Sequence, residues 1–297
     1  DHWRLACLTR HKGYVGWRDK MADWRPIIKC RDNGFPRIMG VINITPDSFF
    51  KESRSNSLEK ISEKAIMMAE NGADWIDVGG ESTRPGASEV RLEEEMNRVS
   101  GAIGIIRDEL PNIGISIDTR KSQVALSALK YGADMVNDIS SLSDPEMKNV
   151  ILENNCPICI MHMKGLPGNM QNDPTYGDVI QEVKQDLKDV SEELIQAGVD
   201  KRKIINDPGI GFGKLLKHNL KLLSAGREII SDDAMPLMWG VSRKKMFEDL
   251  LGRDEIKNRL AGTLGVAAMA REKKVDILRV HDVSEHYDLY RTMYALE

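Results

Sequence analysis

The sequence is short of cysteine and has no excess of positive charge. Its 297 residues contain only four cysteines, too few for a disulfide framework in a chain of this size, so we expect a reducing compartment, the cytoplasm. The formal net charge of −4 gives no broad basic field, and nucleic acid is therefore not an expected partner. Any bound anion must be held by local groups.

Long apolar runs are absent as well. No stretch approaches the roughly 18 apolar residues of a membrane-spanning helix, so we expect no contact with a membrane. The amino-terminal segment DHWRLACLTRHKGYVGW also lacks the apolar core of a secretory signal. Hydrophobic residues nevertheless make up 41% of the chain and charged residues 30%, which is ordinary for a globular domain that buries a core.

Two of the cysteines, Cys156 and Cys159, form a C-x-x-C pattern. The pattern lies in the apolar run CPICIMHM, which predicts a buried strand, and no second pair of metal ligands is nearby. We therefore interpret both thiols as core residues rather than as a metal or redox site.

Residues 1–36 differ in composition from the rest of the chain. They hold three of the five tryptophans and many charges, and they end in the turn-like sequence DNGFP at 32–36. We interpret them as an amino-terminal extension. It is either the tail of an upstream domain or an arm that packs on the following domain, and the sequence leaves both open.

From residue 37 to residue 297, short apolar or β-branched runs alternate with amphipathic helical stretches. Gly-Ala-Asp occurs at 72–74 and again at 132–134, and each copy indicates a helix that ends on glycine before the next strand. The predicted strands are 38–43, 74–79, 114–118, 134–138, 157–162, 203–207, 236–241 and 276–281, and the helical stretches include 57–71, 89–109, 121–130, 178–197, 254–273 and 284–295.

This pattern predicts an α/β fold of the (β/α)8 TIM-barrel type in a single domain, residues 37–297. Eight strands separated by helices over about 260 residues match the number and size of such a barrel. A doubly wound open sheet is the main alternative, but no G-x-G-x-x-G follows the first strand to support it.

Nearly every predicted strand ends in a polar residue. In a barrel the carboxyl ends of all strands meet at one face, where active sites are built. Helix caps would explain one or two such residues, but not the whole set. The set predicts a site at this face, and it consists of Asn43, Asp77, Asp118, Asn137 with Asp138, His162, Asp207, Ser242 with Arg243 and Lys244, and Arg279 with His281.

The residue types at these strand ends suit a phosphate and a flat polar ring. Arg279 and His281 are a cation and an imidazole side by side, which favours a pyrophosphate group, although Arg279 could instead pair with a carboxylate and His281 could be a hydrogen-bonded wall residue. The segment 242–245, SRKK, adds cations after the seventh strand. A mixed donor and acceptor set can read the edge of an aminopyrimidinone ring, and it comprises Asp118, Asn137, Asp207 and Lys244.

Several segments together closely resemble the signatures of the dihydropteroate synthases. MGVINITPDSF at 39–49 is similar to the first signature of that family, and IDVGGESTRPG at 76–86 is similar to the second. The remaining matches follow in family order: SIDT at 116–119, VNDI at 136–139, MHM at 161–163, DPGIGFGK at 207–214, SRK at 242–244 and RVHD at 279–282.

The resemblance implies a transferase that joins 6-hydroxymethyl-7,8-dihydropterin pyrophosphate to p-aminobenzoate in folate biosynthesis. Asn43 would bind Mg²⁺ at the pyrophosphate, with Arg279 and His281 on the phosphate oxygens and Lys244 as the fourth catalytic residue. The resemblance also implies a homodimer. The pterin would be bound by Asp118, Asn137, Asp207 and Lys244 between walls formed by Met161 and Phe212, and the aminobenzoate pocket would be shaped by Phe49, Thr83, Arg84, Pro85 and Lys245.

Two departures from the family pattern fall in the aminobenzoate half of the site. Phe50-Lys51-Glu52-Ser53 stands where the family has Ser-Asp-Gly-Gly, and Lys245 replaces the usual serine after SRK. A larger aminobenzoate derivative is therefore an alternative amine. A pterin-dependent methyltransferase and a non-catalytic pterin-binding paralogue are the alternative functions.

Overall fold

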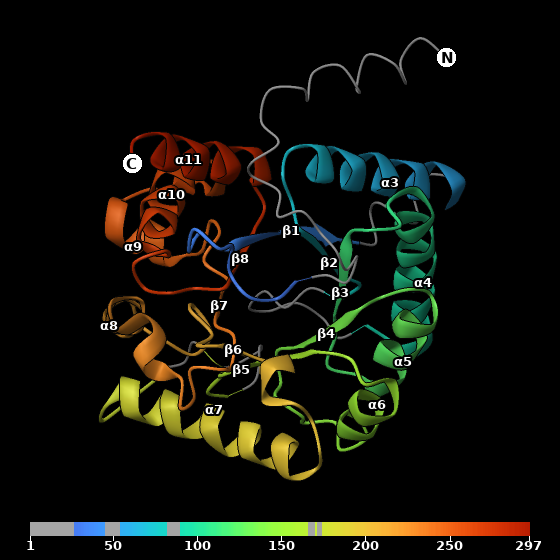
Figure 1. Ribbon diagram of the computed structural model, residues 1–297, viewed down its shortest axis with the longest axis horizontal. Helices are drawn as coiled ribbons and strands as arrows, with labels where there is room; N and C mark the ends of the chain where they lie inside the picture. Colours follow the sequence, from blue (N-terminus) through green and yellow to red (C-terminus); the bar gives the residue numbers. More distant parts are fainter. Residues whose placement is uncertain (1–26, 45–53, 82–89, 166–169, 171–173) are drawn as a thin grey trace.

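The computed structural model describes residues 27–44, 54–81, 90–165, 170 and 174–297. Eight parallel strands run in the order β6-β5-β4-β3-β2-β1-β8-β7. A bridge between Asn206 of β6 and Leu237, just before β7, joins the two ends of this order and closes the ring. Helices surround the strands on all sides of the view in Figure 1. The predicted (β/α)8 barrel is confirmed, and the open sheet is excluded.

Each predicted run coincides with one strand to within a few residues, except that the seventh, expected over 236–241, contains only two residues in β7. The strands are β1 (Arg37–Asn43), β2 (Trp75–Gly79), β3 (Gly114–Asp118), β4 (Met135–Asp138), β5 (Ile158–Met161), β6 (Ile204–Asp207), β7 (Met238–Trp239) and β8 (Ile277–Val280).

The helices lie close to the expected ranges, with one exception. The stretch 254–273 is a 3-10 turn, Ile256–Arg259, followed by the shorter helix α10. The helices are α3 (Arg54–Glu70), α4 (Leu92–Glu109), α5 (Ser122–Lys130), α6 (Met147–Asn154), α7 (Val179–Gln196), α8 (Leu216–Ala225), α9 (Met246–Leu251), α10 (Leu260–Met269) and α11 (Val283–Ala295), with further 3-10 turns at Lys201–Lys203 and Gly226–Ile229.

Helix α4 illustrates how the outer layer is built. Its apolar residues Val99, Ala102, Ile103 and Ile106 recur with the i, i+3, i+4, i+7 spacing that places side chains on one face of a helix. All four are fully buried, and the helix packs against β2 and β3. Burial of this stripe stabilises the helix on the outside of the barrel, while the opposite face keeps its charges in water.

The barrel interior near the amino-terminal ends of the strands is filled by an apolar layer, called the lower layer below. Trp75 occupies so much of it that a side chain at Gly114 would place its Cβ 2.4 Å from the indole. Cys159 is a free thiol in this layer, and Cys156 is also buried, so the interpretation of both as core residues is confirmed. The layer consists of Met39, Trp75, Met135, Cys159, Ile205, Met238 and Ile277.

The described part of the amino-terminal extension, residues 27–36, lies against the barrel end that holds this layer. The Trp75 Nε1–H donates to the carbonyl of Ile27 at 3.0 Å, and Ile28 packs on the apolar layer. Arg31 forms an ion pair with Asp74 at 2.5 Å. Residues 27–36 thus pack on the barrel, while residues 1–26 lie outside the described residues.

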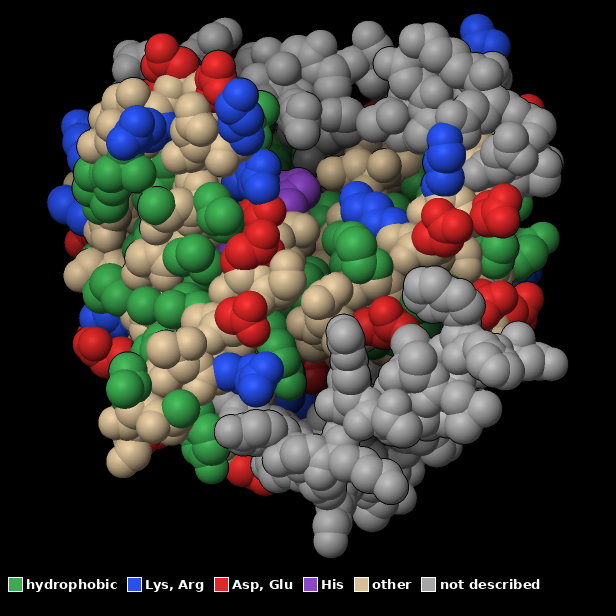
Figure 2. All heavy atoms as spheres, turned by 90° about the horizontal axis from the view of Figure 1, so that it is seen from above, with side chains coloured by type: hydrophobic (Ala, Val, Ile, Leu, Met, Phe, Trp, Pro, Cys, Tyr) green, Lys and Arg blue, Asp and Glu red, His purple; other side chains and the backbone are tan. Residues whose placement is uncertain are grey.

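Charges of both signs are interspersed on the face shown in Figure 2. Among the described residues, no helix is both long enough and apolar enough to cross a membrane.

Candidate active site

Four strands bring ionisable side chains to the carboxyl end of the barrel. Asp77 lies on β2, Asp118 and Asp207 end β3 and β6, and Arg279 lies on β8. The Arg279 guanidinium donates through Nε to Asp77 Oδ2 at 2.7 Å and through Nη2 to Asp118 Oδ2 at 2.7 Å. Both carboxylates are buried. The shared cation offsets the cost of burying two negative charges, and removal of any one partner would leave an uncompensated charge.

Burial also changes the protonation of these carboxyls. It raises the pKa of Asp118 to about 7, an effect that Arg279 opposes and that the neighbouring Asp77 strengthens. Burial likewise raises the pKa of Asp207, against the opposing charge of Lys244. Asp118 Oδ2 accepts from Arg279 in the structure, so the raised pKa reflects the cost of burying a carboxylate that Arg279 only partly offsets.

Three buried polar atoms at this end lack a hydrogen-bond partner among the described residues. They are Asp77 Oδ1, Ser116 Oγ and Asn137 Oδ1. Asp77 and Ser116 are paired in register across β2 and β3, and Asn137 is paired with Asp118 across β3 and β4. An unsatisfied buried polar atom costs on the order of 1–3 kcal/mol. Their grouping at one end of the barrel indicates a polar ligand rather than scattered packing defects.

Lys244 lies beside Asp207 at the same carboxyl-terminal end of the barrel, which is called the mouth below. Its Nζ is 4.4 Å from the centroid of the Phe212 ring and donates to the carbonyl of Ile210. Burial lowers the pKa of Lys244 to about 8, although Asp207 acts to raise it. A Cβ on Gly240 would lie 3.5 Å from Asp207 Oδ2 and 3.8 Å from Lys244 Nζ, so this glycine keeps the space between the two charged groups open.

Asn43 ends β1, and its side chain faces the same mouth. A Cβ on Gly79 would lie 3.5 Å from Asn43 Oδ1 and 3.5 Å from Asp118 Cβ, so both side chains border the space that this glycine leaves open. The described residues contain no group of three or more His, Cys, Asp or Glu side chains placed to hold a metal. An amide oxygen is a suitable Mg²⁺ ligand when phosphate and water oxygens complete the coordination, so the residues present fit that ion.

Two polar residues that follow β7, Ser242 and Arg243, contact other side chains of the protein. The His281 Nδ1 lies 3.0 Å from Ser242 Oγ, which also accepts the His281 N–H at 3.1 Å. Burial, followed by the charge of Arg279, lowers the pKa of His281 to about 4, so its imidazole is neutral at neutral pH. Arg243, at a left-handed φ of 55°, forms an ion pair with Asp282.

Arg279 and His281 thus show the contacts that the sequence allowed as an alternative, a cation paired with carboxylates and a hydrogen-bonded wall residue. Their assignment to the pyrophosphate stays a prediction. Lys245 is exposed and directly precedes the short helix α9. Among the described residues, the structure brings together Asn43, Asp118, Asn137, Asp207, Phe212, Lys244 and Arg279 at the barrel mouth.

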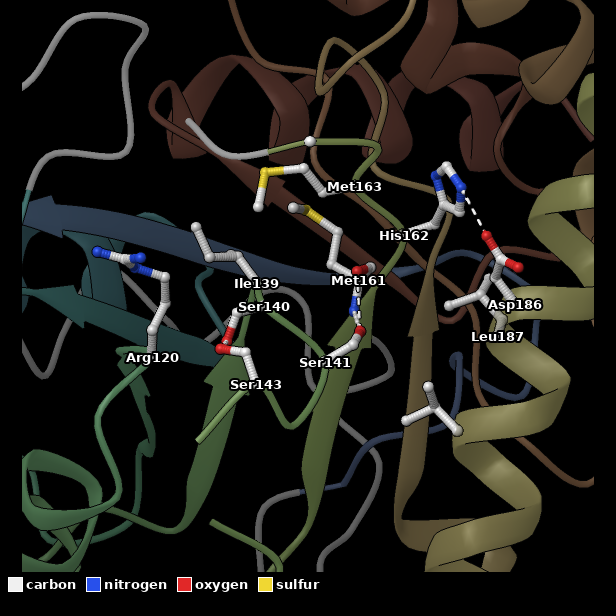
Figure 3. Close-up of a pocket in the computed structure, with 12 residues that line it drawn as sticks. Arg120, Ile139, Ser140, Ser141, Ser143, Met161, His162, Met163, Asp186 and Leu187 are labelled. Carbon is white, nitrogen blue, oxygen red and sulfur yellow. Dashed lines mark hydrogen bonds and ion pairs between the residues drawn. The ribbon is translucent and has the colours of Figure 1, made fainter. Parts of the chain in front are cut away.

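A pocket of about 180 Å³ opens between the ends of β4 and β5 and helix α7 (Figure 3). Met161, a predicted wall of the pterin site, lines it together with Met163 from the same segment. His162 points away from the two methionines toward Asp186 of α7, with 3.2 Å between His162 Nε2 and Asp186 Oδ2.

The predicted loop residues Phe49, Thr83, Arg84 and Pro85 lie outside the described residues. The two ends of the segment 82–89 are tied together, because Glu81 Oε1 accepts the N–H of Val90 at 3.3 Å. Lys121 donates to Glu81 at 3.1 Å and to the fully buried Glu95 at 2.6 Å. Arg120 adds a contact to Glu81 at 3.2 Å. The two residues that flank this segment, Glu81 and Val90, are therefore joined directly and through Lys121, whose Nζ also donates to the Val90 carbonyl.

Comparison with known proteins gives one consistent answer. The family described as pterin binding enzyme matches residues 39–281. The dihydropteroate synthase of Escherichia coli K12 is 42% identical over 264 residues, which cover 89% of this chain and 93% of that protein. The chain belongs to the dihydropteroate synthase family.

Solved structures of the same family share the fold. A Yersinia pestis dihydropteroate synthase in a sulfonamide drug complex has a TM-score of 0.82 and 37% identity, covering 90% of this chain and 96% of that chain. A Xanthomonas albilineans dihydropteroate synthase with 4-aminobenzoic acid has a TM-score of 0.81 and 36% identity, covering 89% and 94%. The resemblance predicted from the motifs is confirmed, and the relatives named here are dihydropteroate synthases.

The sequence did not predict what two residues at this end of the barrel contact. Asp77 was noted only as a strand-end residue, although its position two residues after Trp75 places both on the inward face of β2. Lys214 was seen only as the last letter of a motif, yet it is 3% exposed, which is rare for a lysine and signals a specific set of acceptors. The contact of Asp77 with Arg279 and the carbonyl acceptors around Lys214 come from distant parts of the chain, so they cannot be found without the fold.

Proposed function

We propose that the chain condenses 6-hydroxymethyl-7,8-dihydropterin pyrophosphate with p-aminobenzoate, giving 7,8-dihydropteroate and pyrophosphate, with Mg²⁺ as the cofactor. The observation that carries the proposal is the set of buried, partly unpaired polar groups at the barrel mouth. Membership of the dihydropteroate synthase family supports the same reaction.

The pterin is bound by its polar edge. Asp207 and Asp118 accept hydrogen bonds from the ring N–H groups, while Asn137 and Lys244 supply donors to its oxygen and nitrogen atoms. Burial supports this role, because each hydrogen bond gains strength in a site from which water is excluded. Phe212 stands over the ring from one side, held by its contact with the Lys244 ammonium at 4.4 Å.

The diphosphate is held at the other side of the mouth. Arg279 is already oriented by Asp77 and Asp118, so its charge meets the departing pyrophosphate without reorganisation. His281, neutral at neutral pH, offers an imidazole N–H. Asn43 would hold Mg²⁺ through its amide oxygen, and the ion when bound would neutralise charge on the pyrophosphate.

The bond between the pterin methylene and the pyrophosphate oxygen breaks first, and the pyrophosphate takes the electron pair. Electron donation from the dihydropterin stabilises the cationic carbon, and the aromatic amine then attacks it and loses a proton to water. This order needs no strong general base. The contacts at the mouth support this order, because His281 is hydrogen-bonded to Ser242 and the Arg279 guanidinium is bound by two carboxylates.

A second copy of the chain is the proposed partner, and the cytoplasm is the proposed compartment. Helix α10 carries no charged residue and only one polar side chain, the buried Thr263, and Met269 on it is 47% exposed. Nearby, Leu251 and Ile256 are exposed as well. A helix with this composition on a protein surface favours burial against another chain. A hollow of about 420 Å³ lies between the end of α9 and the start of α10, and it is lined by Leu251, Arg253, Asn258 and Ala261.

The test is pyrophosphate release from the dihydropterin pyrophosphate, with and without p-aminobenzoate and with and without Mg²⁺. Release that requires both the amine and the metal ion supports the proposal. Tight pterin binding by calorimetry without release would indicate the non-catalytic paralogue, and release only with a larger aminobenzoate derivative would correct the amine. Sedimentation of the wild type and of Met269→Glu tests the dimer, which the glutamate should weaken.

A further inference from the structure

Lys214 is a buried lysine that bridges two loops at the barrel mouth. Four acceptors surround its Nζ, of which it can donate to at most three at a time: His162 Nδ1 at 2.8 Å and the carbonyls of His162, Gly209 and Phe212 at 3.1, 3.0 and 3.0 Å. The first two acceptors belong to the loop after β5, and the other two belong to the loop after β6. One buried amine, whose pKa is lowered by burial and raised by Asp207, therefore joins the segment that follows Met161 to the segment that carries Phe212.

The imidazole of His162 is arranged to accept from Lys214. Burial and the charge of Lys214 lower the pKa of His162 to about 3, so the ring is neutral. Its Nε2 lies 3.2 Å from Asp186 Oδ2, which assigns the ring proton to Nε2 and leaves the Nδ1 lone pair for Lys214. The carboxylate of Asp186 on α7, visible beside His162 in Figure 3, thereby orients the ring.

The β6 loop can approach the β5 loop this closely only because it lacks side chains at two positions. A Cβ on Gly209 would lie 1.9 Å from the His162 carbonyl oxygen, and one on Gly213 would lie 2.5 Å from the Lys164 carbonyl oxygen. Both glycines also have positive φ, 65° and 59°. The contact exposes carbonyl groups to a buried space, and Lys214 satisfies them.

The loop after β6, which Lys214 contacts, carries Phe212, and the Lys244 ammonium lies over the Phe212 ring. Between Gly209 and Gly213 the chain offers the Ile210 carbonyl to Lys244 Nζ and the Phe212 ring to its charge. A displacement of this loop would move Phe212 and release Lys244 from its place beside Asp207. Lys214 itself is too deeply buried to reach a ligand.

We propose that Lys214 is a positioning residue for the pterin: with His162 and Asp186 it fixes the β6 loop so that Phe212 and Lys244 stand ready to receive the ring. The proposal rests on the proposed function, because it presumes that a pterin binds at this mouth. It assigns pterin affinity to a residue that does not touch the pterin, and it assigns no role to Lys214 in the departure of pyrophosphate.

The main experiment is a double-mutant cycle read by calorimetry with 6-hydroxymethyl-7,8-dihydropterin. Lys214→Met is expected to weaken pterin binding roughly tenfold in the unsubstituted background and less than about twofold in a Phe212→Ala background, because coupled residues are non-additive. The same substitution is made in a Lys244→Ala background, and equal weakening in all three backgrounds overturns the proposal, since Lys214 would then act through neither Phe212 nor Lys244. Lys217→Met, an exposed lysine three positions later, is the control and should leave the affinity unchanged.

A second pair of variants covers the case in which Lys214→Met does not fold. His162→Asn keeps an acceptor near the position of Nδ1, whereas His162→Leu removes it. The proposal expects His162→Asn to retain most of the pterin affinity and His162→Leu to lose it, with a raised KM for the pterin substrate and little change in kcat. Equal affinities in the two variants would overturn it.

The two proposals fail in distinguishable ways. If the unsubstituted chain does not bind the dihydropterin, the proposed function fails at its first step, and Lys214 then has no pterin to position. If the chain binds the pterin and releases pyrophosphate while Lys214→Met binds equally well, the function stands and the positioning role is wrong.

Discussion

The interior of the barrel has two layers of opposite character, built from the same strands two residues apart. On β2 the inward residue Trp75 belongs to the apolar lower layer, and the next inward residue, Asp77, belongs to the ionic upper layer. On β8 the pair is Ile277 and Arg279. One step of two residues, about 7 Å along a strand, separates a core from a binding site.

The difference between the layers teaches where stability and function lie in this barrel. Apolar side chains of the lower layer are satisfied by one another, so each contributes to the free energy of unfolding. The upper layer holds unpaired buried acceptors and carboxyls of raised pKa, which burden folding unless a ligand is bound. Substitutions in the two layers should therefore have different consequences, in the following order of size.

Trp75→Ala should have the largest effect, and on stability rather than catalysis. Removing the fully buried indole from the lower layer should lower the free energy of unfolding by about 3–5 kcal/mol, because a cavity remains. Urea unfolding measures the loss, and turnover per folded molecule should stay near the wild-type value. A comparable loss of turnover at full folding would contradict the separation of the layers.

Arg279→Ala should lower turnover, and it should also lower stability, because Asp77 and Asp118 are left buried without their shared cation. The change removes the cation between Asp77 and Asp118, and we expect kcat to fall by about 10²–10³, the usual consequence of losing a preorganised charge at a leaving group. Binding of a pterin that lacks the diphosphate should weaken much less. Arg202→Ala, at an exposed surface ion pair, is the matched control. A kinetically silent Arg279→Ala would refute the assignment to the leaving group.

Asp118→Asn should weaken pterin binding by about 1–3 kcal/mol without unfolding the barrel, because it changes one buried acceptor. It should also alter the pH dependence of stability. The raised pKa, about 7, means that the folded state binds a proton that the unfolded state releases near pH 4. The wild type should therefore lose stability relative to Asp118→Asn as pH rises from about 4 to about 7. Urea unfolding across that range measures the difference, and parallel curves would contradict the raised pKa.

Met135→Leu should have the smallest effect. The substitution conserves volume in the lower layer and should cost less than about 1.5 kcal/mol of stability, with no change in pterin affinity or turnover. Thermal unfolding and steady-state kinetics measure both quantities. If this variant lowered pterin affinity, the lower layer would be coupled to the site, and the two layers would not be independent.

The strands and most helices were predictable because their signals are local. β-branched runs bounded by turn residues identify strands, and the glycines at 72 and 132 have the positive φ values that end the preceding helices. The helix over 254–273 was predicted too long for a local reason as well. Its first residues form a 3-10 turn, Ile256–Arg259, in which the Arg259 side chain donates to the carbonyls of Arg253 and Asp254.

The members of the site were predictable, but their partners were not. Asp118, Asp207 and Lys244 were identified from their place at strand ends and from motifs. The pairing of Arg279 with Asp77 spans 202 positions of the chain and exists because β1 pairs with both β2 and β8, which brings the first and last strands of the chain side by side. Likewise, Lys214 meets His162 across 52 positions because two loops pack backbone to backbone.

The order of residues was enough to establish the family, the eight-stranded alternation and the end of the strands at which the chemistry lies, since periodicity and motifs are properties of neighbours along the chain. The ion-pair partners of each charge, the pKa of Asp118 and the neutral state of His162 and His281 depend on distance and burial. Those quantities arise only when remote segments meet in a space that excludes water, because a charge is stabilised or penalised by all the groups around it.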